Sequence, residues 1–188
     1  YSKNFSVAAQ ESAPTDIAFN TDGTKMHIVG RVGNKVNEYA LSTGFDVSTA
    51  SFTDGFSVAS QDTAPQGLAF NADGTKMFIA GNTNDTVFQY ALTTGFDVST
   101  ASYSQNFSVA AQESAPTDIA FNTDGTKMLI VGRVGNKVNE YALSTGFDVS
   151  TASFTDGFSV ASQDTPPQGL AFNAAGTKMF TAGNTKDT

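Results

Sequence analysis

The chain of 188 residues has no cysteine and no tryptophan, and His27 is its only histidine. Without cysteine it has no disulfide framework, no thiolate metal ligand and no cysteine nucleophile. A single histidine argues against zinc sites and Ser–His–Asp triads, which need several partners at fixed geometry. Zinc chemistry and the commonest kinds of nucleophilic catalysis are therefore close to excluded.

Basic residues are also few. Ten lysines and arginines stand against 18 aspartates and glutamates, which gives a formal net charge of −8. Nucleic-acid binding depends on Lys and Arg neutralising phosphates, so we expect no nucleic-acid partner. No stretch approaches the ~20 apolar residues needed to span a bilayer, so we expect no membrane insertion. The simplest interpretation of the acidity is solubility.

A repeat dominates what the sequence does contain. Phe5-Ser6-Val7-Ala8 returns at Phe56, Phe107 and Phe158, always 51 residues further on. Residues 1–86 and 103–188 also align without a gap, so the duplicating unit is 102 residues long and consists of two unlike halves. The aligned copies differ at six positions: Lys3/Gln105, His27/Leu129, Ala64/Pro166, Asp73/Ala175, Ile79/Thr181 and Asn84/Lys186. Repeats of this length bury their faces only by stacking on neighbours.

Each 51-residue unit is predicted to form four strands. In the first unit, alternating or apolar runs occupy 16–20, 25–30, 35–41 and 52–58. Asp22-Gly23 is a strong hairpin signal, and Asp46 is expected to form a turn in the longer connection before the fourth run. Evenly spaced sets of four antiparallel strands predict an all-β fold, a β-propeller built from four-stranded blades. A parallel β-solenoid is the rival, but its coils are shorter and lack a hairpin in every unit.

Residues 1–188 are therefore predicted to form one propeller region. Its units are an outer strand at 1–7 that belongs to a preceding or closing blade, blades at 8–58, 59–109 and 110–160, and an incomplete blade at 161–188. The second superrepeat lacks the counterpart of Val87–Ser102. A closed four-bladed ring would leave strand edges unpaired. We expect either a window onto a ring of six or eight blades, or a ring that several chains assemble.

The sequences PTDIAFNTDGTKMHIVG and VNEYALSTGFDVSTASF resemble propeller repeats of phage and marine bacterial proteins. Those repeats are loosely related to the WD40, NHL and lactonase-type propellers, although the Trp-Asp dipeptide of WD40 repeats does not occur here. The resemblance covers the whole chain. It implies the propeller fold and a location outside the cell, on a bacterial surface or a virion. It says little about activity, because such propellers host many functions.

Loops at one end of the blades are the first candidate binding surface. In an antiparallel blade, the loop from the second to the third strand lies at the same end as the loop that enters the first strand. Loops on a rigid scaffold are where binding usually occurs, although the same residues also suit solvated turns. The candidates are Gln10, Glu11, Arg31, Asn34, Lys35, Gln61, Asp62, Asn82, Asn84, Arg133, Asn136 and Lys137.

The central channel is the second candidate. The first strands offer Asp16 and Asp118, with Gln66 and Gln168 in neighbouring places. Carboxylate and amide oxygens suit a hard cation such as Ca²⁺. Lactonase-type propellers hold a divalent metal with such side chains, so the resemblance implies Asp16 and Asp118 as metal candidates. The sequence shows no EF-hand-like pattern in support.

The leading prediction is an interaction or structural module that is not an enzyme and has no cofactor. Its partner would be a protein or a glycan, or further blades supplied by a parent chain or by another copy. The alternative is a metal-dependent, lactonase-like hydrolase with its site in the channel. Near-identical blades argue against that alternative, because an active site needs particular residues at particular blades.

Overall fold

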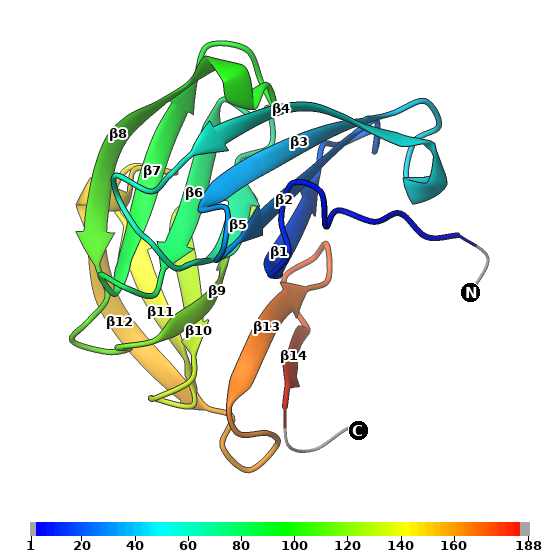
Figure 1. Ribbon diagram of the computed structural model, residues 1–188. Coiled ribbons are helices and arrows are strands. Elements are labelled where there is room, and N and C mark those ends of the chain that lie inside the picture. Colours follow the sequence, from blue (N-terminus) through cyan, green and yellow to red (C-terminus); the bar gives the residue numbers. More distant parts are fainter. Residues whose placement is uncertain (1–2, 185–188) are drawn as a thin grey trace.

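The computed structural model describes residues 3–184, which form three four-stranded sheets and one two-stranded sheet (Figure 1). The strands are β1 (Pro14–Phe19), β2 (Lys25–Gly30), β3 (Lys35–Leu41) and β4 (Ala50–Ser57); β5 (Pro65–Phe70), β6 (Lys76–Gly81), β7 (Thr86–Leu92) and β8 (Ala101–Ser108); β9 (Pro116–Phe121), β10 (Lys127–Gly132), β11 (Lys137–Leu143) and β12 (Ala152–Ser159); and β13 (Pro167–Phe172) and β14 (Met179–Gly183). Each sheet is antiparallel and its strands pair in sequence order. The predicted all-β fold of four-stranded blades is confirmed.

Turn chemistry explains why each blade repeats the same local path. Gly23 has a φ of +71°, the left-handed conformation that the Asp-Gly hairpin between β1 and β2 requires. Before β4, the Asp46 carboxylate accepts a hydrogen bond from Ser48 N at 3.1 Å and caps a single 3₁₀ turn, η1 (Val47–Thr49). The turns η2 (Val98–Thr100) and η3 (Val149–Thr151) repeat this arrangement. None of the helical turns between residues 3 and 184 is long and apolar enough to cross a membrane.

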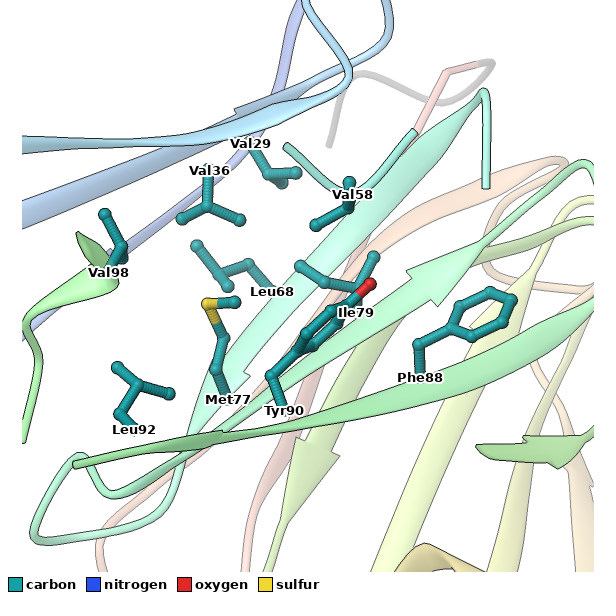
Figure 2. Packing of buried hydrophobic residues seen from close by; sticks show 10 residues of the cluster. All are labelled: Val29, Val36, Val58, Leu68, Met77, Ile79, Phe88, Tyr90, Leu92 and Val98. Atoms are coloured by element: carbon teal, nitrogen blue, oxygen red, sulfur yellow. The ribbon is translucent and has the colours of Figure 1, made fainter. Parts of the chain in front are cut away.

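The blades stack face to face around a common centre. The first strands β1, β5, β9 and β13 lie toward the middle of the molecule, and β4, β8 and β12 lie at its rim (Figure 1). Figure 2 shows how Val29 and Val36 of the first blade pack against Leu68, Met77 and Ile79 of the second. Burial of each such side chain contributes roughly 1.5–3 kcal/mol. The core therefore lies between blades rather than within any one of them.

The first blade leaves one face uncovered. Ile17 is 49% exposed, whereas the residues at the same repeat position, Leu68 and Ile119, are 5% and 4% exposed. The following blade covers the other face of the first blade, but no described blade precedes it. An apolar surface is therefore open on this side of the stack.

The N-terminal segment 3–7 forms no strand, and Tyr1 and Ser2 lie outside the described residues. An outer strand needs a third strand as its partner, and the described residues place none beside this segment. Its position nevertheless matches the repeat. The Phe5 and Tyr39 rings meet edge to face at 5.4 Å, just as Phe56 meets Tyr90 at 5.5 Å.

Matched substitutions at one repeat position test the idea that blade stacking stabilises the fold. We expect Ile119→Ala to lower the free energy of unfolding by about 2–5 kcal/mol, because it leaves a cavity between blades. Ile17→Ala, at the open face, should cost about 1 kcal/mol or less. Urea unfolding followed by tyrosine fluorescence measures both. Equal losses of unfolding free energy in the two variants would contradict the conclusion that one face of the first blade is uncovered.

Candidate functional site

An aspartate follows a β-bulge on the first strand of the first and third blades. The register shifts between Pro14 and Asp16 on β1, and opposite the Val131–Gly132 step on β9, just before Asp118. Bulges commonly redirect the side chains beside them. The bulged residue Thr15 donates its hydroxyl hydrogen to the Pro65 carbonyl at 3.2 Å, which links two blades.

Backbone amides of two blades hold each aspartate. Asp16 accepts hydrogen bonds from Ile17 N on its own strand and from Leu68 N on β5, both at 2.7 Å. Asp118 accepts from Ile119 N and from Leu170 N on β13, also at 2.7 Å. Each carboxyl group therefore joins its own blade to the next one.

Asp16 and Asp118 also contact each other, although their blades are not neighbours in the sequence. Burial raises the pKa of Asp16 to about 6. Burial, and then the negative charge of Asp16, raise the pKa of Asp118 to about 7. The amide donors act in the opposite direction, but desolvation outweighs them. Between these values the pair shares about one proton.

Glycine occupies the same repeat position in the even blades. A Cβ atom on Gly67 would lie 2.8 Å from Asp118 Cα and 3.0 Å from Ile119 N. Both are backbone atoms, which cannot move aside as easily as the end of a flexible side chain. Packing between the second and third blades therefore requires glycine at position 67.

Polar side chains converge on Arg133. Its Nη2 donates to Gln168 Oε1 at 2.8 Å and to Gln66 Oε1 at 3.3 Å, and its Nε donates to Gln168 Oε1 at 3.2 Å. Partial burial, and then the charge of Arg31, lower the pKa of Arg133. Gln168 Nε2 is buried without a hydrogen-bond partner among residues 3–184. Arg133, a residue predicted for the loop face, therefore contacts two residues predicted for the channel.

A groove of about 380 Å³ opens beside Asp16. Its walls are mainly apolar and include Phe5, Ile17, Met26 and Val47. Thr15 and Asp16 supply its polar groups. An apolar hollow with a few polar groups and a carboxyl group of raised pKa has the usual features of a small-molecule site.

The pair fits a cation poorly. No group of three His, Cys, Asp or Glu side chains with metal-ligand geometry occurs in the part of the chain that the structure describes. All four carboxylate oxygens of Asp16 and Asp118 already accept backbone hydrogen bonds. The expected amide ligands, Gln66 and Gln168, turn their oxygens to Arg133 instead. The site suits a shared proton better than Ca²⁺.

Two predicted loop-face residues are in fact internal. Glu11 and Asp62 are each 1% exposed, so they are not surface contacts. Glu11 accepts from Val32 N at 3.2 Å and from Gly33 N at 2.8 Å, and Asp62 bonds the corresponding loop of the second blade. Each carboxylate is buried because the loop between the second and third strands folds around it. The residues next to Glu11 and Asp62 in the sequence do not indicate this burial.

The other loop-face candidates remain at this end of the blades. Gln10 and Gln61 accept hydrogen bonds from Tyr39 and Tyr90, each at 3.4 Å. Asn34 and Asn136 adopt positive φ angles of 49° and 48°, which marks them as turn residues. Asn82 is half-buried, whereas Lys35, Asn84 and Lys137 are exposed. The structure does not gather this set into one site.

His27 is fully buried on β2. Its Nε2 lies 3.1 Å from the Phe96 carbonyl oxygen and 3.7 Å from Glu38 Oε2, and its ring packs on Phe70. All of these contacts cross to the second blade or stay within the sheet. The residue therefore serves the contact between blades.

Known structures place this architecture among the β-propellers. A protein of Bacteroides fragilis, provisionally described as a 6-phosphogluconolactonase, matches with a TM-score of 0.64 and 16% identity over 90% of this chain and 47% of its own. The periplasmic gluconolactonase of Pseudomonas aeruginosa matches at 0.61 and 14%, over 89% and 42%. A structure of the mitotic checkpoint complex matches at 0.62 and 12%, over 90% and 46%.

The chain has a β-propeller fold. It spans about half the length of the structures it matches, and likeness at this identity shows the fold alone. No protein-family model and no curated protein sequence matches it. The narrower relation to phage and marine repeats stays a prediction.

The prediction that the chain is not an enzyme is contradicted by the lactonases among the similar structures. That prediction assumed that near-identical blades cannot supply particular residues at particular places. The meeting of Asp16 and Asp118 shows that two copies of one repeat position can form such a place.

The packing at the axis can be tested with two equivalent glycines. We expect Gly67→Ala to lower the free energy of unfolding by about 1–3 kcal/mol, because the new methyl group meets backbone atoms. Gly169→Ala should change it by less than about 1 kcal/mol, since the nearest atom to its Cβ would lie 3.7 Å away. Thermal unfolding compares the two. Equal losses would contradict a tight axis around Asp118.

The carboxyl pair predicts that stability falls as pH rises from about 4.5 to 7.5. In this range the folded state holds protons that the unfolded state has released, so the stabilisation is lost as pH passes the raised pKa values. Asp118→Asn replaces the protonated carboxyl group with a neutral side chain of the same shape and should flatten the dependence. Urea unfolding at several pH values measures this. An unchanged slope in that variant would contradict a shared proton.

Proposed function

We propose that this propeller region carries a hydrolase site that acts on lactones of sugar acids. The observation that carries the proposal is the Asp16–Asp118 pair, two buried carboxyl groups of raised pKa, of which Asp16 borders an apolar groove. The lactonases among proteins of similar fold agree with this choice of substrate class. The site is assigned no metal, because its donor set does not fit one.

The pair supplies an acid and a base together. Near neutral pH one carboxyl group is ionised and the other is protonated. The carboxylate accepts a proton from water as the water oxygen attacks the lactone carbonyl carbon, and the carboxylic acid donates its proton to the carbonyl oxygen. The ring C–O bond then breaks as the newly protonated carboxyl group donates its proton to the ring oxygen. The ionised carboxyl group takes the proton of one hydroxyl group of the tetrahedral intermediate, which leaves a hydroxy acid and restores the one-proton pair.

The groove and the arginine cluster account for binding. Burial removes most water from the carboxyl pair, which favours reaction in a low-dielectric site. Arg133 and Arg31 add positive charge to a chain that is acidic overall. Guanidinium groups bind carboxylate and phosphate groups well. This pairing favours substrates that carry an anionic group.

The activity test uses glucono-δ-lactone and a pH-stat that records acid release above the spontaneous rate. We expect Asp16→Asn and Asp118→Asn each to lower kcat/KM by about 100-fold or more, because each removes one half of the acid–base pair. Asp124→Asn, at an exposed turn, is the matched control and should leave the rate unchanged.

The pH profile gives a second readout for the same variants. The one-proton form is most abundant between pH 6 and 7, so kcat/KM should pass through a maximum there. Chelation with EDTA should leave the rate unchanged. A rate no faster than the spontaneous reaction, or full activity in Asp16→Asn, rules the proposal out.

A protein-binding surface is a second candidate function. Val32 and Val134 are each 65% exposed in the loops between the second and third strands, next to Arg31 and Arg133. Exposed apolar side chains beside arginines are typical of protein interfaces. The similar propeller in the mitotic checkpoint complex belongs to a protein assembly. A glycan partner and a location outside the cell stay predictions from the sequence.

A further inference from the structure

A phenylalanine loop locks each blade to the one before it. Phe96, in the loop before β8, packs on Phe70 at 5.3 Å between ring centroids, and its carbonyl accepts a hydrogen bond from Lys25 Nζ of the preceding blade at 3.0 Å. Val98 N donates to Glu38 Oε2 at 3.0 Å. The Gly-Phe-Asp-Val loop therefore inserts as a knob into a socket between two blades.

The contact between the second and third blades repeats this arrangement. Phe147 packs on Phe121 at 5.4 Å, and its carbonyl accepts from Lys76 Nζ at 2.9 Å. Val149 N donates to Gln89 Oε1 at 3.1 Å. The same three contacts thus occur twice, with Gln in place of Glu as the acceptor.

The third copy of the socket is open. A hollow of about 630 Å³ lies between the third and fourth blades, and Phe121, Leu129 and Phe172 are among its lining residues. Lys127 and Glu140, which match Lys25 and Glu38, form an exposed ion pair at 3.0 Å. No described residue covers them in the way that Phe96 and Val98 cover the first pair.

Two further observations identify what the socket lacks. Gly23, Gly74 and Gly125 each lie under the phenylalanine of their own blade, whereas no atom of the described chain would lie within 4 Å of a Cβ on Gly176. The second strand pairs with a third in the complete blades, but β14 pairs only with β13 among the described residues. The hairpin that leads into β14 therefore lines an apolar hollow, and one edge of β14 has no partner among the described residues.

We propose that this socket and the edge of β14 bind a separate polypeptide segment with the repeat's own third-strand chemistry. The segment has the character of residues 86–102, a strand that ends in Gly-Phe-Asp-Val. Its strand adds to β14 by backbone hydrogen bonds. Its phenylalanine fills the hollow over Gly176 and Leu129. Lys127 donates to its carbonyl oxygen, and Glu140 accepts from the valine amide.

The test titrates the protein with a synthetic peptide of residues 86–102 in a calorimeter. We expect a Kd in the micromolar range, which is about −8 kcal/mol. A peptide with Phe96→Ala should bind at least about tenfold more weakly, because it leaves the hollow empty. This comparison keeps the protein unchanged, so it does not depend on the folding of a variant.

Two substitutions at one socket position locate the binding site. Leu129→Asp places a charge in the hollow and should abolish binding. Leu129→Phe introduces the residue that the even blades carry at this repeat position, Phe78 and Phe180, and it should preserve binding. Circular dichroism checks that both variants fold. No binding of the peptide at 1 mM, or equal binding by the Phe96→Ala peptide, overturns the proposal, and so does unchanged binding to Leu129→Asp.

Discussion

The whole fold depends on each blade covering the apolar face of its neighbour. A single antiparallel blade of this repeat has apolar residues on both faces and cannot bury them without a neighbouring blade. In the stack, Val29 and Val36 of the first blade pack against Leu68 and Met77 of the second. The loop at Phe96 of the second blade accepts a hydrogen bond from Lys25 of the first. Stability is then a sum of nearest-neighbour contacts. Any blade without a neighbour presents an unsatisfied surface.

The same stacking brings the first strands together at the centre, where space is short. Gly67 leaves room for the backbone at Asp118, so the second blade cannot carry a side chain at this position without a clash. The side chains that remain are two aspartates, and crowding removes water from both. Desolvation raises the pKa of each, and the proximity of the second charge raises that of Asp118 further. A packing constraint thereby generates an acid–base pair.

The sequence predicts what local patterns determine. The strands, the hairpins and the turn at Asp46 follow from residues within about ten positions of one another, and the structure contains them. The roles of Glu11 and Asp62 were missed, because a loop some twenty residues away buries them. The sequence offers Asp16 and Asp118 as channel residues and metal candidates, but it does not predict that they pair with each other. Their alternation with Gly67 and Gly169 was readable in the sequence and could have indicated a crowded axis.

Near-identical repeats can still form a single distinctive site. Asp16 and Asp118 have the same neighbours in sequence, yet Ile17 beside the first is half exposed and Ile119 beside the second is covered. Position in the stack therefore gives two identical residues unlike surroundings, and Asp16 alone borders the groove. Acid–base chemistry with paired carboxyl groups needs two like groups whose pKa values differ, and here the charge of one group raises the pKa of the other. Repetition supplies the pair, and position in the stack decides which member borders the groove.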